Sequence, residues 1–164
     1  MPEGSPVVSN TSPILNLALI DRLDLLEAQH PIVTVPESVW EELTDGDDGL
    51  ARITALRKRG ALDVVSVETD ELHVELRREL DAGEAAAITY AVRNDAALVL
   101  LDEREGRKAA RRHGLPVTGV IGILLRAAAE GSIELETEMR RLRQAGFWIA
   151  EDLFEAALER NESE

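Results

Sequence analysis

The segment Asp81–Gly131 alternates helix-like and strand-like patterns, and this alternation limits the folds open to the chain more than any other feature. Two short runs within it are apolar throughout, which is typical of strands buried on both faces. Strands that alternate with helices predict a parallel sheet with helices packed against it. In chain order, the segment is expected to form a helix at Gly83–Arg93, a strand at Ala97–Leu101, a helix at Glu105–His113, a strand at Pro116–Val117 and a helix at Gly119–Glu130.

Three further strands are expected before this segment. Val7–Ser9 is a short β-prone run, and Ile32–Val35 is a β-branched run bounded on each side by proline. Leu62–Val67 alternates between apolar and polar residues, which suits a strand at the edge of the sheet. The chain therefore predicts an α/β fold with a mainly parallel sheet.

The helices outside the central segment have recognisable ends. Ser12 and Pro13 are typical of an N-cap followed by a first-turn proline. Two helical patterns follow the central segment, at Glu134–Ala145 and Ala150–Glu159, and are expected to pack on the same domain. The final residues, Arg160–Glu164, are expected to fray.

The amino-acid composition limits the metal ligands, the cellular location and the partners that are open to the chain. The chain of 164 residues has the length of one domain, contains no cysteine, and so has neither disulfides nor thiolate metal ligands. No apolar run approaches the roughly 18 residues of a membrane span, so a cytoplasmic protein without membrane contact is expected. The formal net charge of −14 counts against binding to nucleic acid without excluding it. Adaptation to a salty cytoplasm, as in halophilic proteins, would also explain an acidic surface.

Polar side chains stand where a parallel sheet places its ligands. Asn10 and Asp102 directly follow strand-like runs, and ligands of open parallel sheets bind beyond the carboxyl ends of the strands. Glu84 lies in the first turn of a helix, and Glu42 lies in the helix that Pro36 opens. Oxygen ligands without histidine or cysteine suit hard ions such as Mg²⁺ or Mn²⁺.

Each of these acids also has a purely structural interpretation. Glu84 would complement the helix dipole, Asp102 would cap the next helix, and Glu42 would be surface charge beside Glu41. Spacing alone therefore predicts an α/β domain and leaves the carboxylate metal site open.

A set of motifs in fixed order resembles the PIN domain family. The motifs are Val7-Val8-Ser9-Asn10-Thr11-Ser12-Pro13, Val35-Pro36 with Val39 and Glu42, Gly83-Glu84-Ala85 with Ala87-Ile88, Leu101-Asp102-Glu103-Arg104 with Arg107, and Val117-Thr118-Gly119. They are most similar to a poorly characterised prokaryotic branch related to VapC-type toxins. The resemblance implies a three-layer α/β/α fold with a central parallel sheet of four to five strands. Residues 1–133 would form the nuclease domain and residues 134–164 its C-terminal helices.

The resemblance also assigns roles to particular residues. It implies catalysis and Mg²⁺ or Mn²⁺ binding by Asn10, Glu42, Glu84 and Asp102, with Glu103 as a further metal ligand. Ser12, Arg104, Arg107 and Thr118 would bind the substrate. Asn10 departs from the family pattern, because asparagine stands where the first acid is expected and one negative charge is missing.

The leading hypothesis is a metal-dependent endoribonuclease that hydrolyses RNA. Family analogy adds an expected homodimer, and a toxin paired with an antitoxin protein. The alternative is a catalytically impaired PIN fold that binds RNA or a partner protein. A phosphotransferase with an aspartyl nucleophile is a weaker third interpretation, because Asn10 stands where that chemistry needs aspartate.

Overall fold

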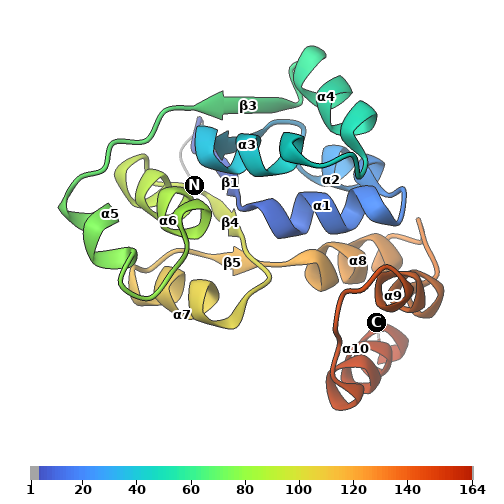
Figure 1. Cartoon of the computed structure of the whole chain (residues 1–164). Coiled ribbons are helices and arrows are strands. Elements are labelled where there is room, and N and C mark those ends of the chain that lie inside the picture. The colour runs from blue at the N-terminus through green and yellow to red at the C-terminus, as the bar shows by residue number, and fades with distance from the viewer. Residues whose placement is uncertain (1–3, 164) are drawn as a thin grey trace.

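The computed structural model describes residues 4–163, which form a parallel sheet in strand order β3-β2-β1-β4-β5 with helices on both faces (Figure 1). This confirms the predicted three-layer α/β/α architecture. The strands agree with the predicted runs to within two residues at their ends. They are β1 (Val7–Ser9), β2 (Val33–Pro36), β3 (Leu62–Val65), β4 (Leu98–Leu100) and β5 (Val117–Thr118).

The helices follow the predicted order, with two corrections. The first helix begins at Thr11, so its N-cap is Asn10 and not Ser12. Pro13 is therefore the third residue of the helix, where proline still fits because the first backbone N–H groups of a helix have no partner within it. The helices are α1 (Thr11–Leu19), α2 (Leu23–Gln29), α3 (Glu37–Asp45), α4 (Leu50–Lys58), α5 (Glu71–Leu76), α6 (Ala82–Arg93), α7 (Arg104–Arg112), α8 (Val120–Ala129), α9 (Leu135–Gln144) and α10 (Glu151–Ser163).

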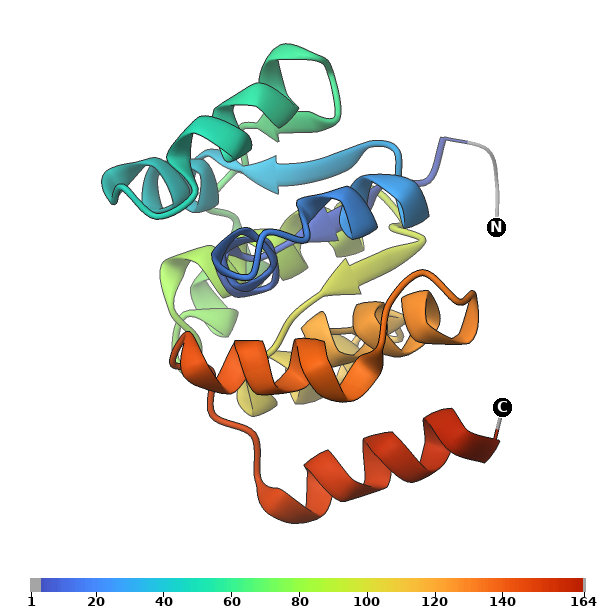
Figure 2. The same ribbon diagram turned by 90° about the vertical axis from the view of Figure 1, so that its right-hand side faces the viewer.

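The second correction concerns the C-terminus. The expected fraying from Arg160 is wrong up to Ser163, because α10 continues to that residue; Glu164 and residues 1–3 lie outside the described part of the chain. Phe154 and Ala157 are buried in α10 and hold it against the rest of the fold. Figure 2 shows α10 running beneath α9 at one end of the molecule.

The sheet separates two apolar cores, which explains the uninterrupted apolar character of β4. Leu100 belongs to the core under α1, α2 and α8, whereas Val99 and Leu101 belong to the core under α6 and α7. Successive side chains of a strand point to opposite faces, so a strand covered on both sides needs apolar residues at every position.

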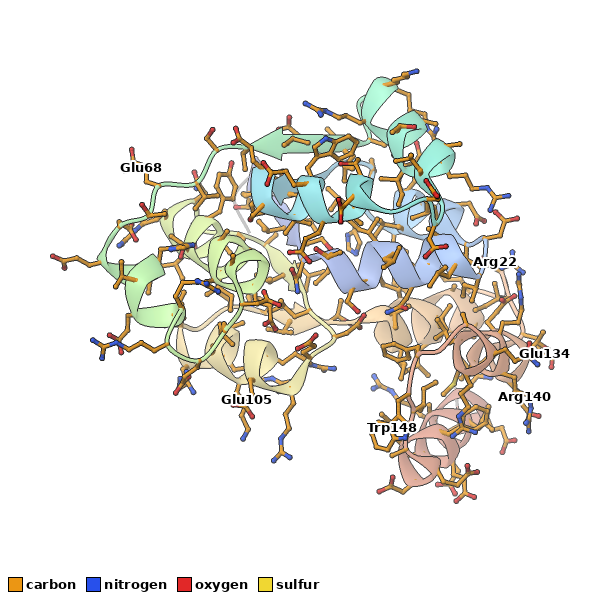
Figure 3. The ribbon with its side chains drawn as sticks, viewed as in Figure 1. Arg22, Glu68, Glu105, Glu134, Arg140 and Trp148 are labelled. Carbon is orange, nitrogen blue, oxygen red and sulfur yellow. The ribbon has the colours of Figure 1, made fainter. Side chains whose placement is uncertain are left out.

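The last two helices are fixed to the larger core. Leu135 and Met139 of α9 are buried in the same cluster as Ile14 of α1. Glu138 of α9 is almost completely buried and accepts a 2.6 Å hydrogen bond from Arg22, at the start of α2. Arg22 is labelled in Figure 3. None of the helices within residues 4–163 has the length and apolar character that a membrane crossing requires.

The strand order reverses direction at β1. From β1 the chain proceeds outward to β2 and β3, and then returns to place β4 on the other side of β1. Ligands of open parallel sheets bind beyond the carboxyl ends of the strands at such a reversal. The residues that follow β1 and β4 are therefore the first candidates for a functional site.

Candidate functional site

Asn10 and Asp102 lie at the reversal point of the sheet, one after β1 and the other two residues beyond β4. The backbone N–H of Asn10 donates a 3.1 Å hydrogen bond to the Leu100 carbonyl, which holds the two strand ends together. The Asn10 residue is only 5% exposed. The geometry places these two predicted site residues at the same edge.

Asp102 is held by donors from two other elements. Its Oδ1 accepts a 2.7 Å hydrogen bond from the Val120 backbone N–H at the start of α8, and its Oδ2 accepts one of 3.0 Å from the Ser12 hydroxyl. Asn16 donates to Ser12 at 2.9 Å and to Asp102 at 3.4 Å. Burial raises the pKa of Asp102, although these hydrogen bonds and the Arg107 charge oppose the rise.

Glu84 caps its own helix with half of its carboxylate and leaves the other half buried. Asp81 accepts a 2.8 Å hydrogen bond from the Glu84 backbone N–H, and the Asp81 N–H donates to Glu84 Oε1 at 3.4 Å, which is a capping box. Glu84 Oε2 is buried, and no described residue is its hydrogen-bond partner. Gly106 makes room for it, since an added Cβ there would lie 2.6 Å from Oε2.

Burial and neighbouring acids make the Glu84 carboxylate costly to ionise. Burial is the largest cause, followed by the Asp81 charge, and together with Glu103 they raise the pKa of Glu84 to about 7. A buried carboxylate oxygen without a donor is uncommon in folded proteins and calls for an explanation. A cation bound at this oxygen would provide one.

Glu42 reaches the same place from α3. The residue is exposed overall, but its carboxylate lies against the start of α6. A Cβ added at Gly83 would lie 2.8 Å from Glu42 Oε1 and 2.9 Å from Asn10 Oδ1, so both oxygens border one small space that only glycine leaves open. Burial, then the Asp81 charge, raises the pKa of Glu42, with the Thr11 hydroxyl opposing and Glu103 adding to the rise.

The acids gather without forming a closed metal cage. Within residues 4–163, no group of three or more histidine, cysteine, aspartate or glutamate side chains is arranged to hold a metal ion. The amide oxygen of Asn10 borders the same space as Glu42. The donor set of carboxylates and one amide suits a hard cation, with water completing the coordination.

The remaining predicted residues lie around this edge. Glu103 is the N-cap of α7, and its charge raises the pKa of both Glu42 and Glu84. Arg104 is exposed in the first turn of α7, whereas Arg107 is half-buried and close enough to Asp102 to influence its pKa. Thr118 ends β5, beside the residues that start α8.

Asp81 and Asn16 also contact the site residues, although neither was predicted to do so from the sequence. Asp81 and Glu84 form the Asp-x-x-Glu pattern of a capping box, which could have identified Asp81 as the N-cap of α6. Asn16 lies four residues after Ser12, on the same face of α1, and side chains at that spacing are neighbours. Both signals were present in the sequence, but neither distinguishes a site from ordinary helix chemistry.

The chain matches a family model described as a PIN domain over residues 6–163. The chain belongs to the PIN domain family. PIN domains are generally nucleases and generally use divalent metal ions, which agrees with the acids at the reversal point of this sheet. No match was found among curated proteins.

Proposed function

We propose that this PIN domain is an Mg²⁺- or Mn²⁺-dependent endoribonuclease. The observation that carries the proposal is a set of acids around the ends of β1 and β4, with the pKa raised for Glu42, Glu84 and Asp102. Asn10 Oδ1 borders the same small space as Glu42 Oε1, and Ser12 of α1 donates a hydrogen bond to Asp102. Burial is the largest cause of each rise, and the Asp81 charge is the second cause for Glu42 and Glu84. A bound divalent cation would favour the ionised form of these acids.

Each residue has a definite task in this proposal. Oxygens of Asn10, Glu42, Glu84 and Asp102 would hold the ion, which when bound would supply an activated water and neutralise charge on the phosphate. Ser12 and Asn16 fix the orientation of Asp102 through their hydrogen bonds. With a pKa of about 7, Glu84 is partly protonated near neutral pH and would release this proton if its carboxylate paired with a cation.

The direct test is cleavage of a labelled single-stranded RNA, with the matched DNA as control. We expect the wild-type protein to cut the RNA with Mn²⁺ or Mg²⁺, to stop when EDTA is added, and to cut the DNA more slowly. Gel analysis of the products over a range of salt concentrations measures this. Intact RNA at every metal and salt concentration, with the protein folded, would contradict the proposal.

The second candidate function is a PIN fold that binds RNA or a protein without cutting RNA. Two observations favour it: Asn10 provides no charge where the family pattern expects an acid, and residues 4–163 contain no closed acidic metal group. The charge at position 10 therefore separates the two functions.

Asn10→Asp provides that separation. We expect the variant to lose on the order of 2 kcal/mol of stability without metal, because a new carboxylate is buried beside Glu42. In return it should bind Mn²⁺ roughly tenfold more tightly, since affinity rises with the number of charged ligands. Thermal melting and calorimetric Mn²⁺ titration measure the two effects, with Asn94→Asp at the far end of α6 as the matched control. Unchanged Mn²⁺ affinity would place residue 10 outside any metal site.

Pairing with an antitoxin protein and assembly as a homodimer are further parts of the proposal. They rest on the resemblance to VapC-type toxins alone. Sedimentation of the purified chain tests the dimer, and growth arrest on expression, relieved by a co-expressed neighbouring gene product, tests the toxin role.

A further inference from the structure

A cleft of about 510 Å³ opens between α7, the β5–α8 junction and α10, next to the candidate site. Its walls include arginines from three different helices, Arg107, Arg126 and Arg160. Thr118, Gly119 and Gly122 of the β5–α8 junction also line it. The cleft brings together segments that are far apart in the sequence.

The charge of this cleft is opposite to that of the chain. The whole sequence has 32 acidic against 18 basic residues, yet the residues that line the cleft include three arginines and no carboxylate. Arg126 pairs with Glu130 at 3.0 Å, but both side chains are more than half exposed, and such surface pairs contribute little stability. An anionic ligand can therefore replace Glu130 as the partner of Arg126.

The cleft borders one of the acids, Asp102. Gly119 lines the cleft, and a Cβ added there would lie 2.5 Å from Asp102 Oδ1. Arg107 belongs to its wall, and its charge lowers the pKa of Asp102 against the larger effect of burial. A ligand that fills the cleft would therefore reach the edge at which Asp102 lies.

We propose that this cleft holds the phosphates of an RNA strand beyond the bond that is cut. The proposal rests on the proposed nuclease function and adds the path of the substrate, with Arg126 and Arg160 as the residues that bind it. The guanidinium group is suited to phosphate because its planar fork donates paired hydrogen bonds. A strongly acidic protein also needs a local basic surface to bind RNA.

RNA binding without catalysis tests the proposal. The probe is a fluorescein-labelled 12-nucleotide uridine RNA, measured by anisotropy in EDTA so that no cleavage occurs. The test variant is Arg126→Gln with Arg160→Gln, and the control is Arg52→Gln with Arg78→Gln, two exposed arginines of ion pairs on α4 and just after α5. Both variants lose two positive charges, so any difference in their affinity for the RNA is due to where the arginines lie.

We expect the cleft variant to bind the 12-mer at least about tenfold more weakly than wild type, and the control within about twofold. The slope of log K against log salt should decrease by about 1.4 in the cleft variant, since each lost phosphate contact on a single strand contributes about 0.7. Melting temperatures close to that of wild type are expected, because both cleft arginines are exposed.

The other outcomes contradict either the RNA-binding role of the cleft or the nuclease proposal. Equal binding by the cleft and control variants, or no binding by wild type, would refute RNA binding in the cleft and leave the cleavage test unaffected. Arginine-dependent binding of a labelled oligoglutamate peptide, without binding of RNA, would assign the cleft to an acidic protein segment. If RNA binding depends on the two arginines but the protein never cuts RNA, the nuclease proposal is refuted and RNA binding in the cleft is still supported.

Discussion

Asp102→Asn is expected to reduce metal-dependent RNA cleavage by at least about 100-fold while leaving the protein folded. Removing even a residue that only supports a metal ligand typically costs 10–100-fold in affinity or activity. Asp102 would contact the ion directly and is also the residue at the reversal point of the sheet. Rates of cleavage of the labelled RNA at saturating Mn²⁺ measure the loss.

The fold should tolerate this substitution for a physical reason. Burial raises the pKa of Asp102, so the folded protein already disfavours its charge. Asparagine keeps one oxygen, which can still accept the 2.7 Å hydrogen bond from the Val120 N–H. The new amide group replaces the oxygen that accepts the hydrogen bond of the Ser12 hydroxyl, so this one hydrogen bond is lost or rearranged. We therefore expect a change in stability of about 1 kcal/mol or less.

Asp63→Asn is the matched control. Asp63 is exposed on β3 and lies beside the residues that precede β1, at the opposite edge of the sheet. The Asp63→Asn variant loses the same single negative charge as Asp102→Asn, at a position away from the candidate site. Equal cleavage rates for Asp102→Asn and wild type would remove Asp102 from the site, whereas a loss shared by both variants would reflect net charge alone.

The fold could be predicted because burial dictates residue type at every strand position. In β4, Val99 and Leu100 pack into different cores, so no polar residue is tolerated and the run is visible in the sequence. The start of α1 could not be located as well, since Asn10, Thr11 and Ser12 are all good N-caps. The structure selects Asn10 because its backbone N–H bonds to Leu100.

The candidate site was only partly predictable. Asn10 and Asp102 follow strands, which places them at one edge of any parallel sheet, but their adjacency depends on β4 pairing with β1. No local pattern specifies that pairing. The role of Gly83 depends on α3 and α6 lying together, so the space bordered by Glu42 and Asn10 appears only in three dimensions.

The arginine cleft was the least predictable feature. Arg107 and Thr118 were candidates through the resemblance to PIN domains, whereas Arg160 lies in a segment expected to fray. A long helix contributes to a distant site only if its buried face orients it, and here Phe154 and Ala157 of α10 provide that face. Periodicity within α10 indicates an amphipathic helix but not the surface on which it packs.

Glu84→Gln is expected to flatten the dependence of stability on pH. The folded protein holds the Glu84 proton up to about pH 7, whereas an unperturbed glutamate releases it near pH 4.5. Between these values the folded state binds more protons than the unfolded state, so stability falls as pH rises and levels off above pH 7. Glutamine keeps an oxygen for the Asp81 N–H and removes the ionisation.

The variant should therefore match wild type near pH 5 and exceed its stability at pH 8 by up to about 3 kcal/mol. Urea unfolding at a series of pH values measures the difference, with Glu41→Gln, an exposed neighbour on α3, as control. Parallel profiles for Glu84→Gln and wild type would show that Glu84 is ionised in the folded protein. Added Mn²⁺ should make wild type more stable than Glu84→Gln at pH 8. The reason is that only the carboxylate of wild type binds the ion, and this binding offsets the cost of burying its charge.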